Sequence, residues 1–441
     1  MTSASFTRRL ALLVSVASSL WLAGCGGSDS TNTGQTNIRA LNLTSDTPSL
    51  DLYIGGNKVF SAATTATLTS SVAMDANTYA VNVNSVGDTA ALFTGTYSLS
   101  EDKHYTAVVW GSQASMRVST LPEDEDTALI TAGLTRVRMF NATTETGSLD
   151  IYLTATATDI SATTPTQGAL TSGALSGFRE IAPGTYRLRV TGAGDPYDVR
   201  LDIPALTLTT SQYSTLMLTA GAGGVLVNGA LIVQQGSATI MTNTQARVRV
   251  VASAEASGIV SATVGGSTLA GGLLSPSVGP YTLITAGDVN VTMRVNGTEI
   301  SNATRTFAAG ADYTLLTLGS TALGHKTVLL TDDNRLPVNL TRAKLRLVNG
   351  LAGPDLLTLS VDYSPLAPDV PSGFASLYAT PLASTSSYVQ VTSTTAGTLF
   401  QSTALNPVSL VAQGVYTVFM LAGNTDAAGK TVPIGVIRRE R

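Results

Sequence analysis

Arginines that alternate with apolar residues are the most suggestive chemical feature of this sequence. Arg136 and Arg138 lie two residues apart in one segment, and Arg187 and Arg189 repeat that spacing in another. Residues two apart in a β-strand point to the same face, so each pair presents two guanidinium groups together. If the two strands are neighbours, the four side chains form a patch that could bind a carboxylate or phosphate group. The alternative, which is the commoner role of arginine in strands, is a polar outer face that keeps a sheet soluble.

Residues that would support catalysis or metal binding do not come together in the sequence. The histidines, His104 and His325, stand alone, without a second histidine or a cysteine at metal-ligand spacing. The motifs Gly-x-Ser-x-Gly and His-Glu-x-x-His are missing as well. Both histidines are therefore interpreted as surface loop residues, and we expect no metal site, no cofactor and no enzymatic activity.

Acidic residues offer two further candidates. The run from Glu123 to Asp126 lacks the Asp-x-Asp-x-Asp-Gly arrangement of a calcium loop, so it is interpreted as a solvated linker. Asp51, Asp150 and Asp362 recur at one place in a repeated segment, but no partner carboxylate recurs beside them. The expected role is a hydrogen bond that anchors a loop, or an outward position on a strand.

The start of the chain has the order of a bacterial export signal. Arg8 and Arg9 precede an apolar run over residues 10–22, which is shorter than the roughly 20 residues of a membrane-spanning helix. The run ends in Leu-Ala-Gly-Cys, which resembles the lipobox of bacterial lipoproteins, where the cysteine thiol receives diacylglycerol. Residues 1–24 are therefore predicted to be a signal peptide, and Cys25 to be the site of lipidation.

The residues around the predicted lipidation site indicate where the protein is held. Cys25 is the only cysteine, so the exported chain can form no internal disulfide. Gly26 follows in place of aspartate, and by resemblance to bacterial lipoprotein sorting this indicates the outer membrane, on either of its sides. Residues 25–36 are small and polar and predict a disordered tether. The expected membrane contact is through the N-terminal lipid.

The composition excludes one class of partner. Charged residues make up 12% of the chain and the net charge is −4, which is unsuited to nucleic-acid binding. The hydrophobic fraction of 44% is sufficient for packed cores. The partners that remain are a protein or a glycan.

A tyrosine followed by an apolar run recurs along the chain. The tyrosines are Tyr105, Tyr213, Tyr313 and Tyr416, spaced by 108, 100 and 103 residues. This spacing is the size of a domain and not of a solenoid repeat, so it predicts a tandem array of four. Each run is nearly continuous in apolar character, which is typical of a strand buried on both faces.

Each repeat opens with a strand in which polar residues, mostly basic, alternate with apolar ones. These strands are residues 38–43, 136–140, 247–251 and 344–348. The alternation predicts one solvated face and one core face.

About six or seven short strands per repeat, without helical periodicity, predict the fold class. It is all-β, with four tandem antiparallel β-sandwich domains, immunoglobulin-like or transthyretin-like, after a lipoprotein signal peptide. The predicted limits of the domains are 37–124, 134–236, 244–334 and 340–441. Their short linkers favour a semi-rigid rod or a compact pair of pairs.

Several of these segments together resemble a known family. They are the opening Arg-x-Arg strand, Ser-Leu-Asp-Leu-Tyr-Ile-Gly-Gly at 49–56, Pro-Gly-Thr-Tyr-Arg-Leu at 183–188 and the Tyr-Thr strands. The family is number 4397 of the bacterial domains of unknown function. The resemblance covers most of residues 36–441, is strongest in the first two repeats and is weakest in the fourth. It implies β-sandwich modules in envelope lipoproteins and supplies no catalytic residue.

Three hypotheses of function follow from the sequence. The first is a lipid-anchored, non-enzymatic protein of the cell envelope that acts as a structural or interaction module. The second is a surface lipoprotein that binds glycans or anionic partners through sheet faces or loop ends of the array, and it predicts that binding is lost when the four patch arginines are neutralised. The third, which no motif supports, is an enzyme with a site assembled between repeats.

Overall fold

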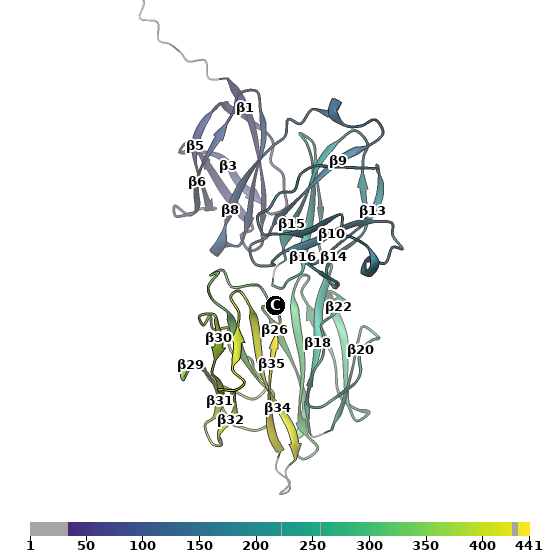
Figure 1. Ribbon diagram of the computed structural model, residues 1–441, viewed down its shortest axis with the longest axis vertical. Helices are drawn as coiled ribbons and strands as arrows, with labels where there is room; N and C mark the ends of the chain where they lie inside the picture. The colour runs from purple at the N-terminus through teal and green to yellow at the C-terminus, as the bar shows by residue number, and fades with distance from the viewer. Residues whose placement is uncertain (1–33, 222, 256, 426–430) are drawn as a thin grey trace, which may run out of the picture.

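The computed structural model describes residues 34–221, 223–255, 257–425 and 431–441 (Figure 1). The predicted signal peptide, Cys25 and residues 25–33 of the predicted tether lie outside the described residues. The described part consists of β-strands joined by turns, with three short 3-10 helices and no α-helix. None of its helices is long and apolar enough to cross a membrane. The prediction of an all-β fold is confirmed.

The strands gather into four successive units, each built from sheets that face one another (Figure 1). In unit 1 the sheet orders are β4-β1-β7-β8 and β3-β2-β5-β6. Its elements are β1 (Gln35–Thr44), β2 (Ser49–Ile54), β3 (Asn57–Thr64), β4 (Val72–Asp75), β5 (Asn77–Ser85), β6 (Ala91–Leu99), β7 (His104–Gly111), η1 (Gln113–Ser115) and β8 (Arg117–Pro122).

Unit 2 has the sheet orders β12-β9-β15-β16-β17 and β11-β10-β13-β14. It is preceded by η2 (Thr127–Leu129). Its elements are β9 (Thr135–Ala142), β10 (Leu149–Thr154), η3 (Ile160–Ala162), β11 (Gln167–Leu170), β12 (Arg179–Ile181), β13 (Gly184–Gly192), β14 (Asp195–Leu208), β15 (Tyr213–Ala220), β16 (Val227–Val233) and β17 (Ala238–Met241).

Unit 3 has the sheet orders β21-β18-β25-β26, with β22 also paired to β18, and β20-β19-β23-β24. Its elements are β18 (Gln245–Ala254), β19 (Ile259–Val264), β20 (Ser267–Leu274), β21 (Ser277–Val278), β22 (Thr282–Thr285), β23 (Gly287–Val295), β24 (Thr298–Phe307), β25 (Asp312–Ser320) and β26 (Gly324–Asp332).

Unit 4 has the sheet orders β27-β34-β35, β29-β28-β31-β32 and β30-β33. Its elements are β27 (Lys344–Asn349), β28 (Leu357–Val361), β29 (Ser364–Val370), β30 (Ser384–Ser387), β31 (Val389–Ser393), β32 (Gly397–Gln401), β33 (Val408–Leu410), β34 (Val415–Thr425) and β35 (Thr431–Arg439).

Two strands extend beyond the limits expected from the sequence. The expected tether includes Gln35 and Thr36, but these residues belong to β1, where Gln35 is paired with Asp75 of β4. Strand β17 follows the expected end of the second repeat at 236, and it pairs with β16 of the same unit. In both cases a segment whose polar composition suggests a loop continues as a strand, because a neighbouring strand offers partners for its backbone N–H and C=O groups.

The sheets are mixed and not purely antiparallel as expected. In every unit the opening strand pairs in parallel with the Tyr-Thr strand, as in β1 with β7 and β18 with β25. The same holds for β9 with β15 and for β27 with β34. Between these two strands the chain passes through the second sheet, so the later strand can return beside the first in the same direction.

One tyrosine of the repeat is displaced by one residue. Tyr105 lies opposite Ile38, whereas Tyr213 lies opposite Arg136 and Ser214 opposite Val137. Ser214 therefore takes the place of Tyr105 in unit 2. Because neighbouring residues on a strand point to opposite faces, Tyr213 points away from the core of its own unit.

A hydrophobic cluster fills the space between the facing sheets of each unit described by the structure. Two further clusters lie between units. One joins unit 1 to unit 2 and contains Val108, Trp110 and Phe140. The other joins unit 3 to unit 4 and contains Leu316 and Phe419. Burying apolar area from both partners stabilises these contacts.

The units therefore form two pairs, which we call pair A (units 1 and 2) and pair B (units 3 and 4) (Figure 1). On β7, Val109 enters the core of unit 1 while Val108 enters the cluster shared with unit 2. This explains the continuous apolar runs, since both faces of the strand are covered. The face of the opening strand that we expected to be solvated is covered too, because the neighbouring unit packs on it.

Candidate functional site

The structure does not bring the four predicted patch arginines together. Arg136 and Arg138 lie on β9, and Arg187 and Arg189 lie on β13, in the facing sheet of the same unit. The patch required the two strands to be neighbours, and sequence spacing alone does not decide which strands pair. That premise is wrong.

Three of these arginines are held by groups of their own unit. Arg136 contacts Glu180 at 3.0 Å through its terminal nitrogen. The Arg187 Nε donates to an oxygen of Asp202 at 2.8 Å. Arg189 donates to the Thr158 carbonyl at 2.7 Å. These contacts use guanidinium donors that an anionic ligand would need.

Arg138 belongs to a different set, which recurs in every unit. In each opening strand one arginine donates through its guanidinium Nε to a threonine hydroxyl on the parallel strand beside it. The pairs are Arg39–Thr106 at 2.9 Å, Arg138–Thr215 at 2.9 Å, Arg249–Thr314 at 2.8 Å and Arg346–Thr417 at 3.4 Å. The parallel register places each arginine directly opposite its threonine. All four arginines are buried.

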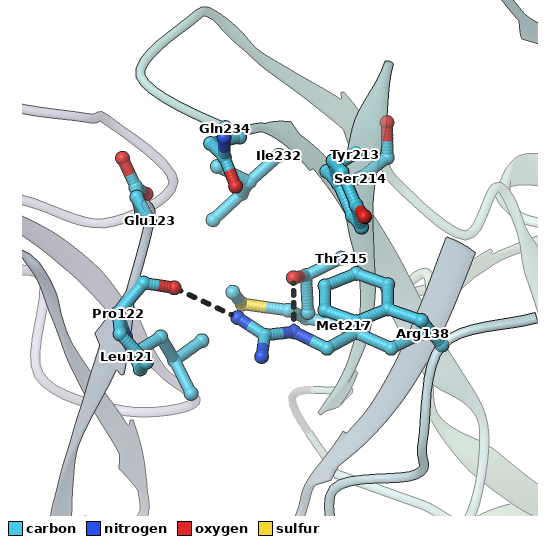
Figure 2. Close-up of a pocket in the computed structure, with 11 residues that line it drawn as sticks. Leu121, Pro122, Glu123, Arg138, Tyr213, Ser214, Thr215, Met217, Ile232 and Gln234 are labelled. Atoms are coloured by element: carbon cyan, nitrogen blue, oxygen red, sulfur yellow. Dashed lines mark hydrogen bonds between the residues drawn. The ribbon is translucent and has the colours of Figure 1, made fainter. Parts of the chain in front are cut away.

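The far end of each guanidinium in pair A crosses to the other unit. Arg138 of unit 2 donates to the Pro122 carbonyl at the end of β8 at 3.1 Å, as Figure 2 shows. Arg39 of unit 1 donates to the carbonyl of Val233 at the end of β16, at 3.2 Å, and to the carbonyl of Gly236 in the turn that follows. The two contacts are reciprocal, so pair A has the character of a two-fold interface between two copies of the unit.

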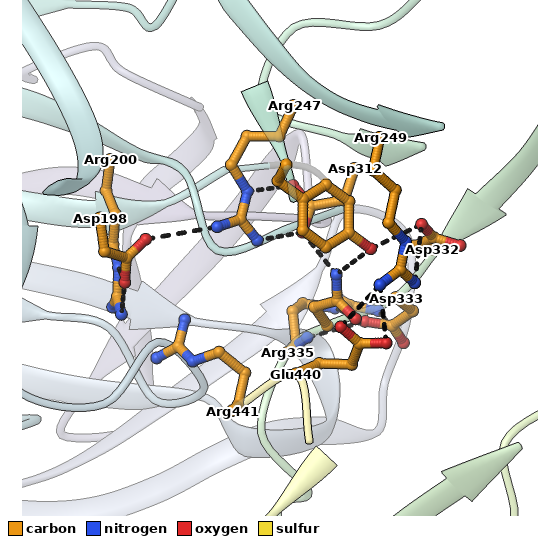
Figure 3. Close-up of polar contacts among 12 residues, drawn as sticks. Asp198, Arg200, Arg247, Arg249, Asp312, Asp332, Asp333, Arg335, Glu440 and Arg441 are labelled. Atoms are coloured by element: carbon orange, nitrogen blue, oxygen red, sulfur yellow. Dashed lines mark hydrogen bonds and ion pairs between the residues drawn. The ribbon is translucent and has the colours of Figure 1, made fainter. Parts of the chain in front are cut away.

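Pair B repeats the reciprocal arrangement with acids added to it. Arg249 of unit 3 contacts Glu440 of unit 4 at 2.8 Å (Figure 3). Arg346 of unit 4 contacts Asp332 of unit 3 and donates to the Thr331 carbonyl of that unit at 3.2 Å. A second ion pair, Arg249 with Asp332, spans 3.6 Å. Burial alone would raise the pKa of Asp332, but Arg346 and Arg249 lower it overall. The carboxylate stays charged inside the interface.

Aromatic rings cover the guanidinium faces in three units. Phe178 lies over Arg138, with 4.6 Å from the guanidinium carbon to the ring centroid. In unit 3 Tyr281 lies over Arg249 at 4.4 Å, and in unit 4 Tyr378 lies over Arg346 at 4.8 Å. Cation–π contacts of this kind are strengthened when both groups are desolvated. Figure 2 shows the cavity beside Arg138. Phe178 also lines this cavity, and its volume is only about 10 Å³, about the space of one water.

The comparison with family models agrees with this repeated geometry. The chain matches the model for a domain of unknown function, DUF4397, over residues 36–152 and 246–356, which is more than half of its length. The chain belongs to this family. The resemblance predicted from the sequence is thereby confirmed. A comparison with curated proteins gives no match. Both DUF4397 matches begin in the opening strand of the first unit of a pair, β1 or β18.

Polar contacts join the two pairs of DUF4397 units. Arg247 of unit 3 is 3.3 Å from Asp198 of unit 2, which also pairs with Arg200 at 2.6 Å (Figure 3). The Leu336 backbone N–H donates to the Glu145 carbonyl at 2.8 Å. These contacts fix the orientation of pair A on pair B, since charged groups in a partly buried junction favour one set of partners.

The two histidines lie in strands and not in surface loops as expected. His104 begins β7, with its Nδ1 at 2.7 Å from Asp124. His325 lies in β26, 3.9 Å from Glu255. Among the described residues, no group of three or more histidines, cysteines or acids is placed to hold a metal ion.

The acidic run from Glu123 to Asp126 is more than a solvated linker. Glu123 is buried and pairs with Arg39 at 2.7 Å. Asp126 caps η2 by accepting from the Ala128 N–H. Charge patterning did not reveal the role of Glu123, because the guanidinium that holds it lies 84 residues away.

All three recurrent aspartates accept hydrogen bonds from backbone N–H groups, as expected of loop anchors, and Asp362 accepts from Tyr388 at 2.8 Å. Asp150 accepts from the backbone N–H of Ala169 at 2.7 Å and of Gly194 at 2.9 Å. Asp51 accepts from the N–H of Ala62. Asp362 does not occupy the place of the other two: it lies in the turn after β28, and Thr358 takes the place of Asp51 opposite the bulged strand.

The sequence interpretation missed the recurrent arginine–threonine pair. Each opening strand carries the arginine and each Tyr-Thr strand carries the threonine, so a signal was present in all four copies. To recognise that signal, one must know that the two strands pair in parallel, and their separation of about 70 residues does not suggest this.

Proposed function

We propose that this protein is a lipid-anchored component of the bacterial cell envelope, with Cys25 as the lipidated residue, and that its DUF4397 units form a non-enzymatic structural or interaction module. The order of charged residues, apolar run and Leu-Ala-Gly-Cys at the N-terminus supports the anchor. Family membership supports the modular character.

The pairing of the units is the observation that carries this proposal. Each pair buries an apolar cluster between two sandwiches, and each interface is locked by arginines that reach across from both sides. An interface with this much apolar packing holds its units in a fixed orientation. A pair of units held in a fixed orientation on a lipid anchor is suited to spacing or displaying a surface.

Fractionation of cells that express the protein tests the anchor. The unaltered chain is expected in the membrane fraction, and Cys25→Ala is expected to move to the soluble fraction. Ser28→Ala, three residues away, is the matched control and should stay with the membrane. A Cys25→Ala protein that remains with the membrane would contradict lipid anchoring at this residue.

Protease treatment of intact cells then distinguishes the two sides of the outer membrane. Digestion of the units from outside would indicate surface display, and a search for environmental or host ligands would follow. Protection until the outer membrane is opened would indicate the periplasm, where a structural partner within the envelope becomes the target.

A further inference from the structure

Unit 1 lacks the aromatic ring that covers the arginine in the other three units. In these units a residue on an edge segment pairs with the opening strand one position before its buried arginine. The pairs are Arg179 with Val137, Thr282 with Val248 and Ala379 with Leu345. The aromatic residue comes immediately before the first member of each pair. These positions give Phe178, Tyr281 and Tyr378. In unit 1 Val72 lies opposite Ile38, so the equivalent residue is Ser71.

A second aromatic residue of this region is also replaced in unit 1. In unit 2 the rings of Phe178 and Tyr213 pack edge to face, with 4.8 Å between their centroids. Tyr213 lies opposite Arg136, and the residue at the corresponding place in unit 1, opposite Asn37, is His104. Where unit 2 has two packed rings, unit 1 therefore has a serine and a histidine.

The consequence is an open cavity above Arg39. Its volume is about 460 Å³, and its lining includes Arg39, Ser70, Ser71, His104 and Glu123. The equivalent space in unit 2, where Phe178 is present, is only about 10 Å³. Within the described residues, unit 1 thus has a vacant place where each other unit inserts a side chain of its own.

The chemistry of Arg39 selects what can enter. Four of its five N–H donors are engaged, by Thr106 at 2.9 Å, Glu123 at 2.7 Å, the Val233 carbonyl at 3.2 Å and the Gly236 carbonyl. Its flat face is uncovered, since no ring of the described chain lies over it in the manner of the three other arginines. An anion needs free donors, whereas an aromatic ring needs a free guanidinium face.

The acid beside the cavity indicates which ring fits. In unit 3 Tyr281 donates its hydroxyl proton to Asp332 at 2.6 Å. Asp332 lies opposite Asp312 in the pairing of β25 with β26. The equivalent residue of unit 1 is Glu123, which follows β8 and lies opposite His104 at the start of β7. In unit 2 that place holds Gln234, and the ring there is a phenylalanine. The presence of Glu123 favours a phenol over a phenyl group.

The chain's own tether cannot supply this ring. Residues 25–36, which precede and enter β1, contain no aromatic residue. We propose that the cavity above Arg39 is a binding site for a tyrosine side chain presented by a partner polypeptide. The ring stacks on the Arg39 guanidinium and the hydroxyl donates to Glu123. This inference deepens the proposed interaction function and rests on it, but it does not depend on the lipid anchor.

Binding is measured on the exported chain, residues 25–441, with Cys25→Ala so that it is isolated in water. The probes are the capped peptides acetyl-Gly-Tyr-Gly-amide, acetyl-Gly-Phe-Gly-amide and acetyl-Gly-Leu-Gly-amide. The readout is the NMR resonance of the Arg39 Nε–H, which a stacked ring shifts upfield. We expect a saturable shift with the tyrosine peptide, a weaker response with phenylalanine and none with leucine.

Variants that fill the site give the decisive comparison. Ser71→Tyr places the missing ring on the chain itself and is expected to weaken peptide binding by at least about tenfold. Thr94→Tyr, at an exposed position on β6 in the other sheet of unit 1, is the matched control and should bind as the parent does. If Ser71→Tyr does not fold, Glu123→Gln replaces it, and should reduce the tyrosine response to the level of phenylalanine.

Three results would overturn the proposal. One is the absence of any Arg39 shift with the tyrosine peptide. Another is tyrosine-peptide binding that is undiminished in Ser71→Tyr, or in Glu123→Gln where that variant replaces it. The third comes from free p-cresol: if it binds more tightly than the peptide, the site takes small phenols and not a polypeptide. None of these results bears on anchoring, which fractionation tests separately.

Discussion

At the scale of single residues, one arginine position is used four times in four settings. Each of these side chains donates to a threonine of its own unit and extends its remaining donors toward the neighbouring unit. In pair A the acceptors in the neighbouring unit are backbone carbonyls, and in pair B they are carboxylates and the Thr331 carbonyl. Arg39 also pairs with Glu123 of its own unit. A buried guanidinium needs nearly all of its donors satisfied, so the position constrains both strands and the partner unit.

Replacement of Arg249 tests how much the buried charges depend on it. Arg249→Met keeps a similar volume but leaves Glu440 without its guanidinium partner in the interface. We expect a loss of about 3 kcal/mol in the free energy of unfolding, as is usual when one member of a buried pair is removed. Urea denaturation followed by circular dichroism measures it.

The control for this substitution is Arg294→Met. Arg294 pairs with Glu299 on the surface, with side chains 40% and 44% exposed. Such exposed pairs contribute at most about 1 kcal/mol. Equal losses in the two variants would show that burial of the Arg249 network adds nothing.

Asp333, in the linker between units 3 and 4, makes the stability of the protein depend on pH. Burial would raise the pKa of Asp333, but Arg335 and Lys344 outweigh it and lower the pKa from 3.8 to about 2. Because the folded-state value is depressed, the stabilisation is complete above the unfolded value and is lost as the pH falls from about 4 toward 2. Asp333→Asn should destabilise the protein at pH 6 and have little effect at pH 2.

Unfolding midpoints at the two pH values check this prediction. The side chain of Asp333 is 38% exposed, so solvent screening reduces the effect below that of a fully buried pair. A difference between parent and variant that is the same at both pH values would contradict it. Asp288→Asn is the matched control, since Asp288 is exposed and lies outside this linker.

The sequence could predict the arginines but not their surroundings. Alternation placed Arg136 and Arg138 correctly on one face of a strand. It could not show that this face is buried, because the covering surface belongs to another repeat. It also could not show that Arg187 lies in the opposite sheet, since pairing is decided by packing between distant segments.

At the scale of elements, a bulged hairpin recurs and is held by a side chain of the adjacent strand. Ala62, Ala169 and Asp369 have φ values of 50°, 47° and 54°, in the left-handed region that alanine and aspartate adopt at a cost. Their backbone N–H groups donate to Asp51, Asp150 and Thr358 respectively. The side-chain acceptors offset the local strain and satisfy an N–H that the bulge removes from the ladder.

Removal of the Asp150 carboxylate tests this arrangement. Asp150 accepts from two backbone N–H groups and is 7% exposed, so Asp150→Ala leaves both donors without a partner. We expect a loss of about 1–3 kcal/mol in the free energy of unfolding. Asp288→Ala, which removes a bond to Thr306 at an exposed site, should cost much less. Similar losses in both would show that Asp150 does not anchor the bulge.

Most strands were predictable because their alternation is local. The turn at Gly55 and Gly56, with φ of 59° and 83°, is the hairpin turn that two consecutive glycines after an alternating segment favour. The parallel pairing was not predictable in the same way. Continuous apolar runs are typical of strands covered on both faces, but the runs do not reveal the direction of the neighbouring strand.

At the scale of the whole molecule, two rigid pairs meet at a polar junction. Apolar clusters hold the units within each pair, whereas the described contacts between the pairs are ion pairs and hydrogen bonds. Interfaces of this polar kind couple folding units weakly compared with a shared core. The compact pair of pairs anticipated from the short linkers is the arrangement found, in preference to a rod (Figure 1).

This difference between interfaces predicts that the two pairs unfold separately. Trp110 is buried between units 1 and 2, and the other tryptophan, Trp21, lies in the predicted signal peptide. Fluorescence of the exported chain therefore reports on pair A alone. Phe419→Ala removes a fully buried ring from the interface of pair B, which should cost pair B about 3–5 kcal/mol.

In urea, Phe419→Ala should lower the midpoint of part of the circular dichroism signal and leave the Trp110 fluorescence midpoint unchanged. The matched variant is Phe140→Ala, whose ring packs edge to face on Trp110 with 5.6 Å between centroids. It should lower the fluorescence midpoint itself. If Phe419→Ala shifts both signals equally, the polar junction transmits stability between the pairs, and the molecule unfolds as one cooperative body.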